Sequence, residues 1–291
     1  MTGLLDGIEV GGRAPRLLFV HAHPDDETLA TGVAIAHHVD RGDDVHVLTC
    51  TLGEEGEVIP AHLAHLEGAD GDPLAAHRRD ELRGAMEVLG VTHHLLGATG
   101  DGGLPAYRDS GMAGSAAAAH PRSWVGADLA DASAAVRAVI DEVAPDVVVT
   151  YDATGGYGHP DHVRTHEATC RAVATAAHPP HLYAVLTPLS WAVADRAWLA
   201  EHVPADRGLV VPGESDPFFP SVVPDEVVTH HVVDASVLPV QTRALTHHET
   251  QVVVGEGWYA LSNHVVARLA GREGFARLDP STGRPVSEDA A

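Results

Sequence analysis

The chain has 291 residues, 45% of them hydrophobic, which is enough for one large domain or two smaller ones around a substantial core. Its 41 acidic residues outnumber its 18 basic ones, and the formal net charge is −23. Nucleic acids and anionic membranes bind basic surfaces, so we expect neither as a partner and favour a neutral or cationic small molecule as substrate. Lysine is absent, which excludes chemistry that needs a lysine amine.

Short apolar runs and longer segments with helical periodicity alternate along the chain. The first apolar run, residues 16–20, ends in a polar cluster and is followed by a helical pattern over 28–41. Gly42 and Asp43 end that pattern, and a second strand is expected at 45–50. A strand, a helix and a strand within so few residues form a βαβ unit, which predicts a parallel sheet with right-handed crossovers.

The same alternation continues through most of the remaining chain. We expect further strands at 93–96, 146–150, 182–186 and 226–234, and further helices at 74–89, 129–143, 160–175, 189–202 and 238–249. A stretch rich in Gly, Ala, Ser and Asp covers 99–126 and is expected to be a long loop over one face. The pattern as a whole predicts an α/β protein.

Cysteine usage and hydropathy bear on the compartment. Cys50 and Cys170 are the only cysteines, too few for a cysteine-rich zinc site. No secretory signal and no apolar stretch of membrane-spanning length is visible. We therefore expect a reduced cytoplasmic protein.

Two polar motifs follow predicted strands in the same way. His23-Pro24-Asp25-Asp26 comes after the first strand, and His159-Pro160-Asp161-His162 comes shortly after the strand at 146–150. Both motifs begin a predicted helix, and the carboxyl ends of parallel strands meet at one edge of a sheet. The members of each pair, His23 with Asp26 and His159 with His162, are three residues apart and can point in one direction.

This arrangement predicts a metal centre. Zinc hydrolases use three nitrogen or oxygen ligands and leave one position for water, and His23, Asp26 and His162 would supply two imidazoles and a carboxylate. Asp25 is then free to act as general base, and His159 is close enough to donate to an oxyanion or leaving group. Either motif alone is more often a cap or a turn; the two together favour metal. Such ligands suit one Zn²⁺ ion per chain, and also Fe²⁺, Co²⁺ or Mn²⁺.

These residues carry a family resemblance. Residues 21–27 and 156–162 resemble the motifs of the LmbE-like (PIG-L) zinc deacetylases. The supporting stretches are 17–20, 50–59, 108–114 and 259–263, so the resemblance extends from about residue 16 to about residue 263. It implies a Rossmann-like fold, a hydrolytic zinc ion bound by His23, Asp26 and His162, and Asp25 as general base.

The resemblance also implies roles for residues around the metal. His159 would be the cationic partner or general acid, with Asp161 behind it as the group that orients its ring. Tyr157 would stabilise the oxyanion or move over the site.

Arg78 and Asp109 fall on family positions that bind sugar hydroxyls. For Arg78 the alternative is a solvated charge on a helix surface, and for Asp109 it is an ordinary turn.

Several other polar residues have weaker contexts. His21 is expected to pack or to support the site rather than to bind metal. The acids Glu54, Glu55 and Glu57 either line the pocket or are solvated loop residues. The histidines of the C-terminal third follow no predicted strand, so we expect ordinary structural roles for His247, His248 and His264.

The resemblance implies a division of the chain. Residues 1–180 would form a Rossmann-like catalytic core, a mostly parallel sheet flanked by helices that carries both metal motifs. Residues 181–271 would form a smaller C-terminal α/β extension that packs on the core and shapes the pocket. Residues 272–291 are expected to be a flexible tail.

The activity implied by the resemblance is hydrolysis of the acetyl group of N-acetylglucosaminyl-myo-inositol, as in mycothiol biosynthesis, with a water at the zinc as nucleophile. The alternatives are a mycothiol S-conjugate amidase or another N-acetyl-sugar deacetylase of the same family. A rival of another class is a non-catalytic α/β protein that binds a metal or a ligand. The free Asp25 beside a complete ligand set favours an enzyme. The sequence does not indicate an oligomeric state.

Overall fold

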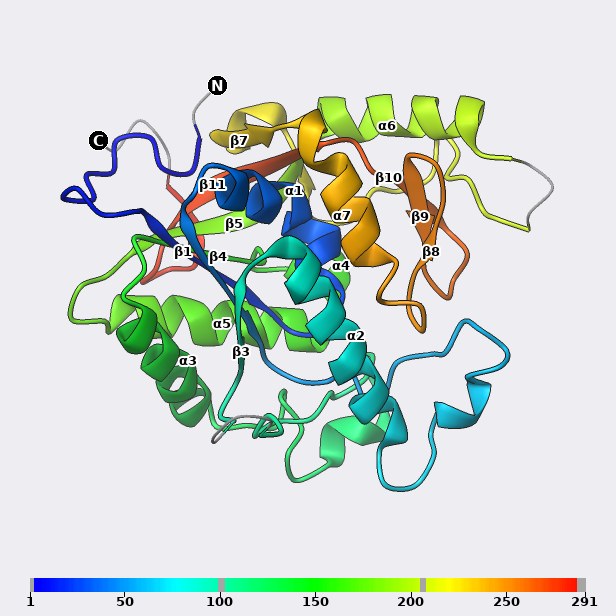
Figure 1. Ribbon diagram of the computed structural model, residues 1–291, viewed down its shortest axis with the longest axis horizontal. Helices are drawn as coiled ribbons and strands as arrows, with labels where there is room; N and C mark the ends of the chain where they lie inside the picture. Colours follow the sequence, from blue (N-terminus) through cyan, green and yellow to red (C-terminus); the bar gives the residue numbers. More distant parts are fainter. Residues whose placement is uncertain (1–2, 99–102, 205–207, 287–291) are drawn as a thin grey trace.

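A central β-sheet with helices on both faces forms the framework of the fold. The computed structural model describes residues 3–98, 103–204 and 208–286 (Figure 1). Five parallel strands lie in the order β3-β2-β1-β4-β5. They are β1 (Arg16–His21), β2 (Asp44–Thr49), β3 (Thr92–Leu95), β4 (Val147–Thr150) and β5 (His181–Pro188). The chain builds outward from β1 to β3 and then returns to place β4 on the other side of β1, so the strand order reverses between β1 and β4. Ligand crevices form at such reversals.

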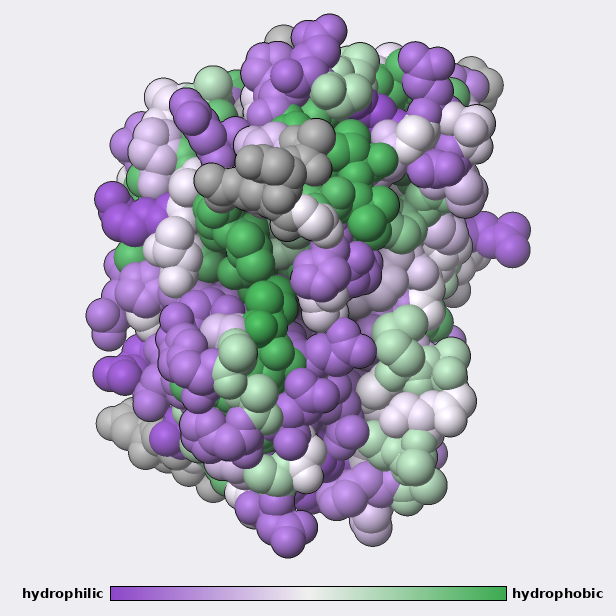
Figure 2. Space-filling model, turned by 90° about the vertical axis from the view of Figure 1, so that its right-hand side faces the viewer, coloured by the Kyte–Doolittle hydropathy of each residue, from purple (hydrophilic) through white to green (hydrophobic). Residues whose placement is uncertain are grey.

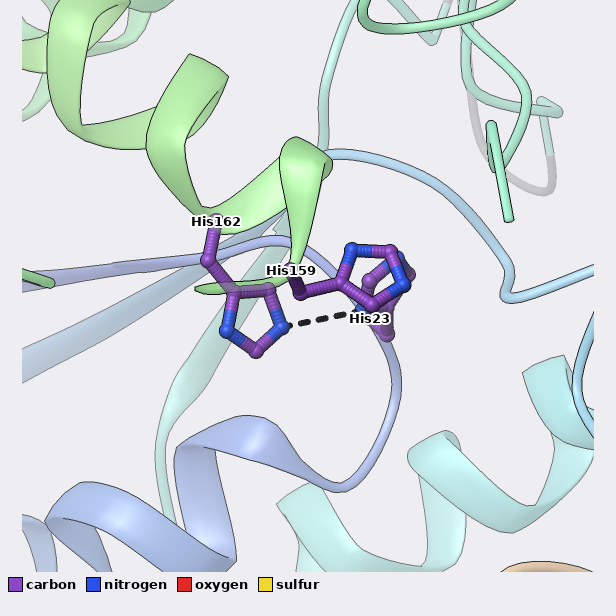
Figure 3. A group of neighbouring side chains, drawn as sticks. All are labelled: His23, His159 and His162. Atoms are coloured by element: carbon purple, nitrogen blue, oxygen red, sulfur yellow. Dashed lines mark hydrogen bonds between the residues drawn. The ribbon is translucent and has the colours of Figure 1, made fainter. Parts of the chain in front are cut away.

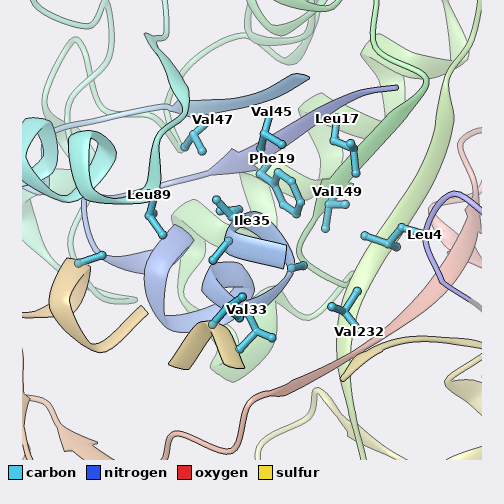
Figure 4. Packing of buried hydrophobic residues seen from close by; sticks show 14 of the residues in the cluster. Leu4, Leu17, Phe19, Val33, Ile35, Val45, Val47, Leu89, Val149 and Val232 are labelled. Carbon is cyan, nitrogen blue, oxygen red and sulfur yellow. The ribbon is translucent and has the colours of Figure 1, made fainter. Parts of the chain in front are cut away.

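The strands are buried on both faces, which explains their nearly continuous apolar sequences. In β1, Leu17 and Phe19 face one side, where they pack with α1 (Asp26–Asp40), α2 (Pro73–Leu89) and α7 (Leu238–Leu245) (Figure 4). Leu18 and Val20 face the other side, where α3 (Leu129–Val143) and α5 (Pro160–Ala174) cover the sheet. The predicted α/β class, with a mostly parallel sheet between helices, is therefore confirmed.

Further helices and strands complete the fold. They are α4 (Gly155–Gly158), α6 (Leu189–His202), β6 (Val222–Val223), β7 (His230–Val233), β8 (Val253–Val254), β9 (Trp258–Ala260), β10 (Val266–Arg268), β11 (Arg272–Asp279) and β12 (Arg284–Pro285). The strands β8, β9 and β10 form a small antiparallel sheet of their own. The predicted helix over 189–202 matches α6, whereas the predicted strand over 226–234 is β7 alone, because a 3-10 turn occupies Asp225–Val227.

The prediction of a flexible tail over 272–291 is wrong for the residues described. β11 extends the central sheet antiparallel to β5, β12 pairs with it, and the side chain of Phe275 is 0% exposed. The Glu273 carboxylate accepts hydrogen bonds from the main-chain N–H groups of Val33 and Ala34 in α1, each at 2.8 Å. Glu273 and its partners in α1 are about 240 residues apart, so the periodicity of the sequence around β11 could not indicate this contact. Residues 287–291 lie outside the described part of the chain.

The same strand bears on the predicted division of the chain. β5 and β11 belong to the sheet that also contains β1 and β4, so the proposed boundary at residue 180 falls within one continuous sheet. No helix among the described residues is long and apolar enough to cross a membrane. On the face shown in Figure 2, hydrophilic side chains surround a limited hydrophobic band, as is usual for a folded globular domain.

Phe275→Ala tests whether β11 is part of the core. We expect a loss of about 3–5 kcal/mol in the free energy of unfolding, because a buried phenylalanine leaves both its transfer energy and a cavity behind. Urea denaturation followed by circular dichroism measures this loss. Arg284→Ala, an exposed change on β12, is the control and should stay within about 0.5 kcal/mol. A change of that size for Phe275→Ala as well would restore the flexible-tail interpretation.

Candidate active site

The two polar motifs meet where the strand order reverses. Asp26 begins α1 just after β1, and His159 is the residue that caps α5, a short distance after β4. Pro160 occupies the first turn of α5, where its missing N–H and fixed φ suit a helix start. The His159 ring nitrogen Nδ1 accepts a hydrogen bond from the main-chain N–H of Asp161 at 3.2 Å. The rings of His23, His159 and His162 consequently lie together (Figure 3).

Three donor atoms form a compact triangle at this point. His23 Nδ1 lies 3.2 Å from Asp26 Oδ2, and His162 Nε2 lies 3.3 Å from both of those atoms. Ligands at about 2.0–2.1 Å from a tetrahedral zinc ion are about 3.3–3.4 Å apart. The donor types and their spacing therefore fit a zinc ion held by these three buried side chains.

The hydrogen-bond partners of His162 and His23 indicate which ring nitrogen of each is free to bind a metal. His162 Nδ1 lies 3.2 Å from the carbonyl oxygen of Gly155, which can only accept, so its Nε2 carries the lone pair. His23 Nε2 faces the carboxylates of Asp109 and Asp161, so in the neutral ring the proton lies on Nε2 and the Nδ1 lone pair is directed at the same point. Burial alone lowers the pKa of His23, but Asp109, Asp161 and Asp26 outweigh it and hold that pKa well above its usual value. The surrounding carboxylates thus favour a positive charge at this place, on the His23 ring or on a bound cation that replaces its Nδ1 proton.

Two other groupings of potential ligands share the region. The donor atoms of His23, His159 and His162 lie within 4.8 Å of one another, as do those of His23, Asp109 and Asp161. The triangle with Asp26 is tighter, with edges of 3.2–3.3 Å. His159 is already engaged through Nδ1 in capping α5.

The resemblance implies that His159 is a cationic partner or general acid, and the surroundings of its ring favour the neutral form. Burial, followed by the neighbouring rings of His23 and His162, lowers the pKa of His159 to about 3. With Nδ1 accepting from the helix, the single ring proton lies on Nε2. Such a low pKa and this cap favour a neutral His159 whose Nε2–H can donate a hydrogen bond.

Asp161 also has a different partner from the one expected. Its Oδ2 lies 3.3 Å from Nε2 of His23 and accepts the main-chain N–H of Ser110 at 2.9 Å. No contact between this carboxylate and the His159 ring occurs among the described residues. The orienting carboxylate thus acts on His23, because the start of α5 directs Asp161 across the site toward β1.

Tyr151 is a supporting residue that the sequence reasoning missed. It stacks on His162 with ring centroids 4.2 Å apart and an interplanar angle of 12°. Its hydroxyl donates to Asp26 Oδ2 at 2.7 Å and accepts the main-chain N–H of Ala22 at 2.9 Å. Tyr151 therefore fixes two of the three metal-facing side chains. The sequence did contain one indication of this role. Tyr151 directly follows β4, as the motif that begins at His23 follows β1.

Asp25 has an unusual backbone and a nearly free carboxylate. Its φ is 112°, a conformation that costs on the order of 1–3 kcal/mol for a non-glycine residue. The nearest cationic atom is Nη2 of Arg78, 3.5 Å from Asp25 Oδ2. Burial raises the pKa of Asp25 to about 7, with Arg78 opposing the shift and Asp26 adding to it. A carboxyl with such proton affinity is suited to general-base chemistry.

Arg78 is buried, which excludes the interpretation of a solvated surface charge. Its side chain is 3% exposed and donates to the carbonyl oxygens of Gly53 at 2.7 Å and of Pro24 at 2.5 Å. Gly53 has a φ of 63°, and a Cβ there would lie 1.8 Å from Arg78 Nη1, so only glycine allows this approach. Arg78 thereby ties the loop after β2 to the loop after β1.

The long loop contributes Asp109 and Ser110 to the same edge. Asp109 is 4% exposed, and its Oδ1 lies 3.5 Å from His23 Nε2. Its main-chain N–H donates to Glu54 at 2.9 Å, so Glu54 is a buried residue that shapes the site rather than a solvated one. The Asp109 carboxylate also accepts from Gly111 and Glu55. Of this predicted loop, residues 99–102 lie outside the described part of the chain.

Tyr157 lies at the open side of the site. Its side chain is 45% exposed, and its ring centroid is 5.1 Å from that of His162 and 6.0 Å from that of Phe219. Phe219 comes from the segment before β6, so the C-terminal part of the chain reaches the mouth of the site. Nothing in the local sequence around Phe219 indicated this.

Two further histidines, His21 and His248, are buried beside the motif that follows β1. His21 is 0% exposed and hydrogen-bonds Thr31 through Nε2, so it packs behind the motif as expected. His248, for which we expected an ordinary role, is also 0% exposed and lies 3.2 Å from Oε1 of Glu27. His248 is thus in contact with the motif after β1.

Comparison with known proteins gives a consistent result. The family model PIG-L, described as GlcNAc-PI de-N-acetylase, matches residues 18–173. The chain is 45% identical over 289 residues to a 1D-myo-inositol 2-acetamido-2-deoxy-alpha-D-glucopyranoside deacetylase of Rhodococcus erythropolis, covering 95% of each chain. A protein of the same name from Mycolicibacterium smegmatis is 44% identical over 278 residues, with 93% of this chain and 92% of that protein covered.

Solved structures resemble this one in fold. N,N'-diacetylchitobiose deacetylase from Pyrococcus horikoshii aligns with a TM-score of 0.54 at 18% identity, covering 96% of this chain and 91% of that one. The teicoplanin deacetylase Orf2, in a zinc-inhibited form, aligns with a TM-score of 0.52 at 20% identity, covering 91% and 99%.

Proposed function

This chain belongs to the PIG-L family of de-N-acetylases, and from that premise we propose that it hydrolyses the acetamido group of 1D-myo-inositol 2-acetamido-2-deoxy-α-D-glucopyranoside. The products are acetate and the free amino sugar. The relatives that match nearly the whole chain carry this substrate in their names. The observation that carries the proposal is the Asp25 carboxylate beside the compact triangle of His23, Asp26 and His162. A neutral sugar also agrees with the acidic chain.

The proposed metal is one Zn²⁺ ion held by His23 Nδ1, Asp26 Oδ2 and His162 Nε2. When bound there, zinc would polarise the amide carbonyl and lower the pKa of water from 15.7 toward about 7. Tyr151 keeps Asp26 and His162 in place through its hydroxyl and its ring. Asp161 keeps His23 in the tautomer whose Nδ1 lone pair faces the centre.

Asp25 is proposed as the group that moves the proton. Its carboxylate takes a proton from the attacking water as the new carbon–oxygen bond forms. The same proton is then delivered to the amine nitrogen as the carbon–nitrogen bond breaks, so Asp25 ends ionised. Arg78 lies close enough to Asp25 to hold the carboxylate in position without occupying both oxygens.

His159 and Tyr157 are proposed as donors to the developing oxyanion. His159 presents Nε2–H because its other nitrogen is committed to the start of α5. Tyr157 is half exposed, so its hydroxyl can reach a substrate entering from the open side. Neutral donors of this kind stabilise the transition state without taking part in proton transfer.

Arg78 and Asp109 are proposed to form the sugar side of the pocket. Most of the Arg78 guanidinium is engaged with main-chain carbonyls, so its contribution is mainly to hold the two loops that face the substrate. Asp109 lies on the long loop before α3, and its Oδ1 is 3.5 Å from His23 Nε2, which places its carboxylate beside the metal-binding side chains.

Release of the free amino sugar, the product that both amide hydrolyses share, is measured side by side on two substrates to test the proposed function. We expect kcat/KM for N-acetylglucosaminyl-inositol to exceed that for a mycothiol S-conjugate by about tenfold or more, the effect of a single contact worth about 1.4 kcal/mol. A preference for the S-conjugate would establish the sister amidase activity instead. Tight ligand binding without release of the amino sugar from either compound would establish a non-catalytic binding protein.

A further inference from the structure

A buried ion pair lies directly behind the proposed general base. His248 Nε2 is 3.2 Å from Oε1 of Glu27, and both side chains are 0% exposed. His248 comes from the turn after α7, whereas Glu27 lies in the first turn of α1. Burying a carboxylate requires hydrogen-bonding or charged partners, so a pair in this position implies a specific requirement for Glu27.

Glu27 turns back toward the residue before its own helix. Its Oε2 accepts the main-chain N–H of Asp25 at 3.2 Å, and its Oε1 accepts the hydroxyl of Thr28 at 2.6 Å. His248 therefore holds the carboxylate that in turn holds the backbone of Asp25. The three residues form one chain of contacts that runs from the C-terminal third of the protein to the general base.

The backbone of Asp25 needs such support. With φ at 112° and ψ at −36°, it occupies a conformation that persists only where the surroundings enforce it. Its carbonyl oxygen accepts the N–H groups of Thr28 and Leu29, at 3.0 and 2.9 Å, which fixes the side toward the helix. Glu27 fixes the N–H on the other side of the same residue.

His248 is itself held firmly. Before it in the chain, Gln241 donates to the carbonyl oxygen of Thr28 at 2.9 Å. After it, Thr250 donates to Glu81 through its main-chain N–H at 2.8 Å and through its hydroxyl at 2.7 Å. The segment from α7 to Thr250 is thus attached to α1 on one side and to α2 on the other.

We propose that His248 and Glu27 are positioning residues that hold Asp25 in its strained, catalytically competent conformation. This inference rests on the proposed function, because it assigns the pair a role in the reaction of that same site. It also gives the C-terminal third a part in catalysis that involves no contact with substrate or metal.

Substitution of His248 tests the proposal through turnover. His248→Leu is expected to lower kcat about 10- to 100-fold, the effect typical of losing a supporting residue, while KM stays within about twofold and metal content is unchanged. His248→Gln should recover most of the lost kcat, because its amide places an N–H donor near the position of Nε2. Failure of Gln to restore activity in a folded variant would overturn the proposal.

His38→Leu is the matched control. His38 is also a buried histidine paired with a carboxylate, at 2.8 Å from Asp43, and lies at the far end of α1. Its loss should lower the melting temperature to a similar extent but leave kcat unchanged. Equal losses of kcat in both variants would mean that the His248 effect is general destabilisation, which contradicts a positioning role.

A double-mutant cycle shows whether His248 acts through Asp25. In the Asp25→Asn background, His248→Leu should cause no further loss of residual turnover, because the group that it positions is already inactive. An equal loss in both backgrounds would contradict the proposal.

Amide hydrogen exchange measures, without substrate, whether His248 stabilises the hydrogen bond between the Asp25 N–H and Glu27. His248→Leu should accelerate exchange in peptides covering Asp25, and His38→Leu should not. Unchanged exchange in the His248 variant would overturn the inference. An absence of acetate release by the unmodified protein would refute the proposed function alone, and the exchange measurement would still decide the inference.

Discussion

Asp25→Asn is expected to keep one metal ion per chain and to lose about 100- to 10,000-fold in kcat, the contribution typical of a general base. Asparagine has nearly the shape of aspartate and tolerates positive φ better than most residues, so the backbone at 112° can persist. It cannot accept a proton from water. Metal analysis and acetate release on the same preparation measure both parts of the prediction.

Asp152→Asn provides the control for this experiment. Asp152 also follows β4 at the same edge of the sheet, but its side chain is engaged in a turn with Thr154 and Gly156. Its substitution should leave turnover within about threefold, since changes away from such special sites have small effects. Full activity of Asp25→Asn would refute the proposed mechanism. Loss of the metal in that variant would move Asp25 into the ligand set.

His162→Ala is expected to abolish metal binding, and with it the activity. The change removes one corner of a triangle with edges of 3.2–3.3 Å and also the ring on which Tyr151 stacks. We expect affinity for Zn²⁺ to fall by much more than the roughly 10- to 100-fold loss that follows removal of a supporting residue. Dialysis against a competing chelator, followed by metal analysis, measures the change.

His159→Ala separates the two candidate ligand sets that contain both His23 and His162. If Asp26 completes the triangle, the His159 variant should retain the metal and lose turnover through the missing oxyanion donor, by about 100- to 1,000-fold. If the metal is bound instead by His23, His159 and His162, then His159→Ala should lose it while Asp26→Asn retains it. Retention of tight zinc by His162→Ala would remove that residue from either set.

The position of the site follows from the topology of the sheet. Neighbouring strands β1 and β4 send their chains in opposite directions along the sheet, and ligands of open α/β sheets bind at such a reversal. One motif follows each of these two strands. The loop after β2 brings Gly53, which binds Arg78, to the same edge of the sheet. The loop before α3 brings Asp109 there, where its N–H donates to Glu54. From the C-terminal part of the chain, Phe219 lies beside Tyr157 at the open side. His248, from the same part, contacts Glu27 behind Asp25.

The local sequence was sufficient to predict the parallel sheet, its flanking helices and the two motifs. Strands buried on both faces have continuous apolar sequences, and helices that cover a sheet have apolar residues at helical spacing, so both patterns are visible within a few residues. The resemblance to the PIG-L family, which rested on those motifs, is confirmed. Asp26 and His162 could be chosen as candidate ligands for the same reason, since their spacing to His23 and His159 is local.

Only the tertiary structure decided which distant residues complete these local features. Asp161 supports His23 rather than His159, Tyr151 holds Asp26, and Glu273 makes β11 a buried strand instead of a flexible tail. His248 had no informative neighbours in the chain, yet it contacts Glu27 behind Asp25. A sequence pattern reports whether a side chain is buried or capping within its own element. The partner of a buried polar side chain is set by how separate elements pack, and that information is distributed over the whole chain.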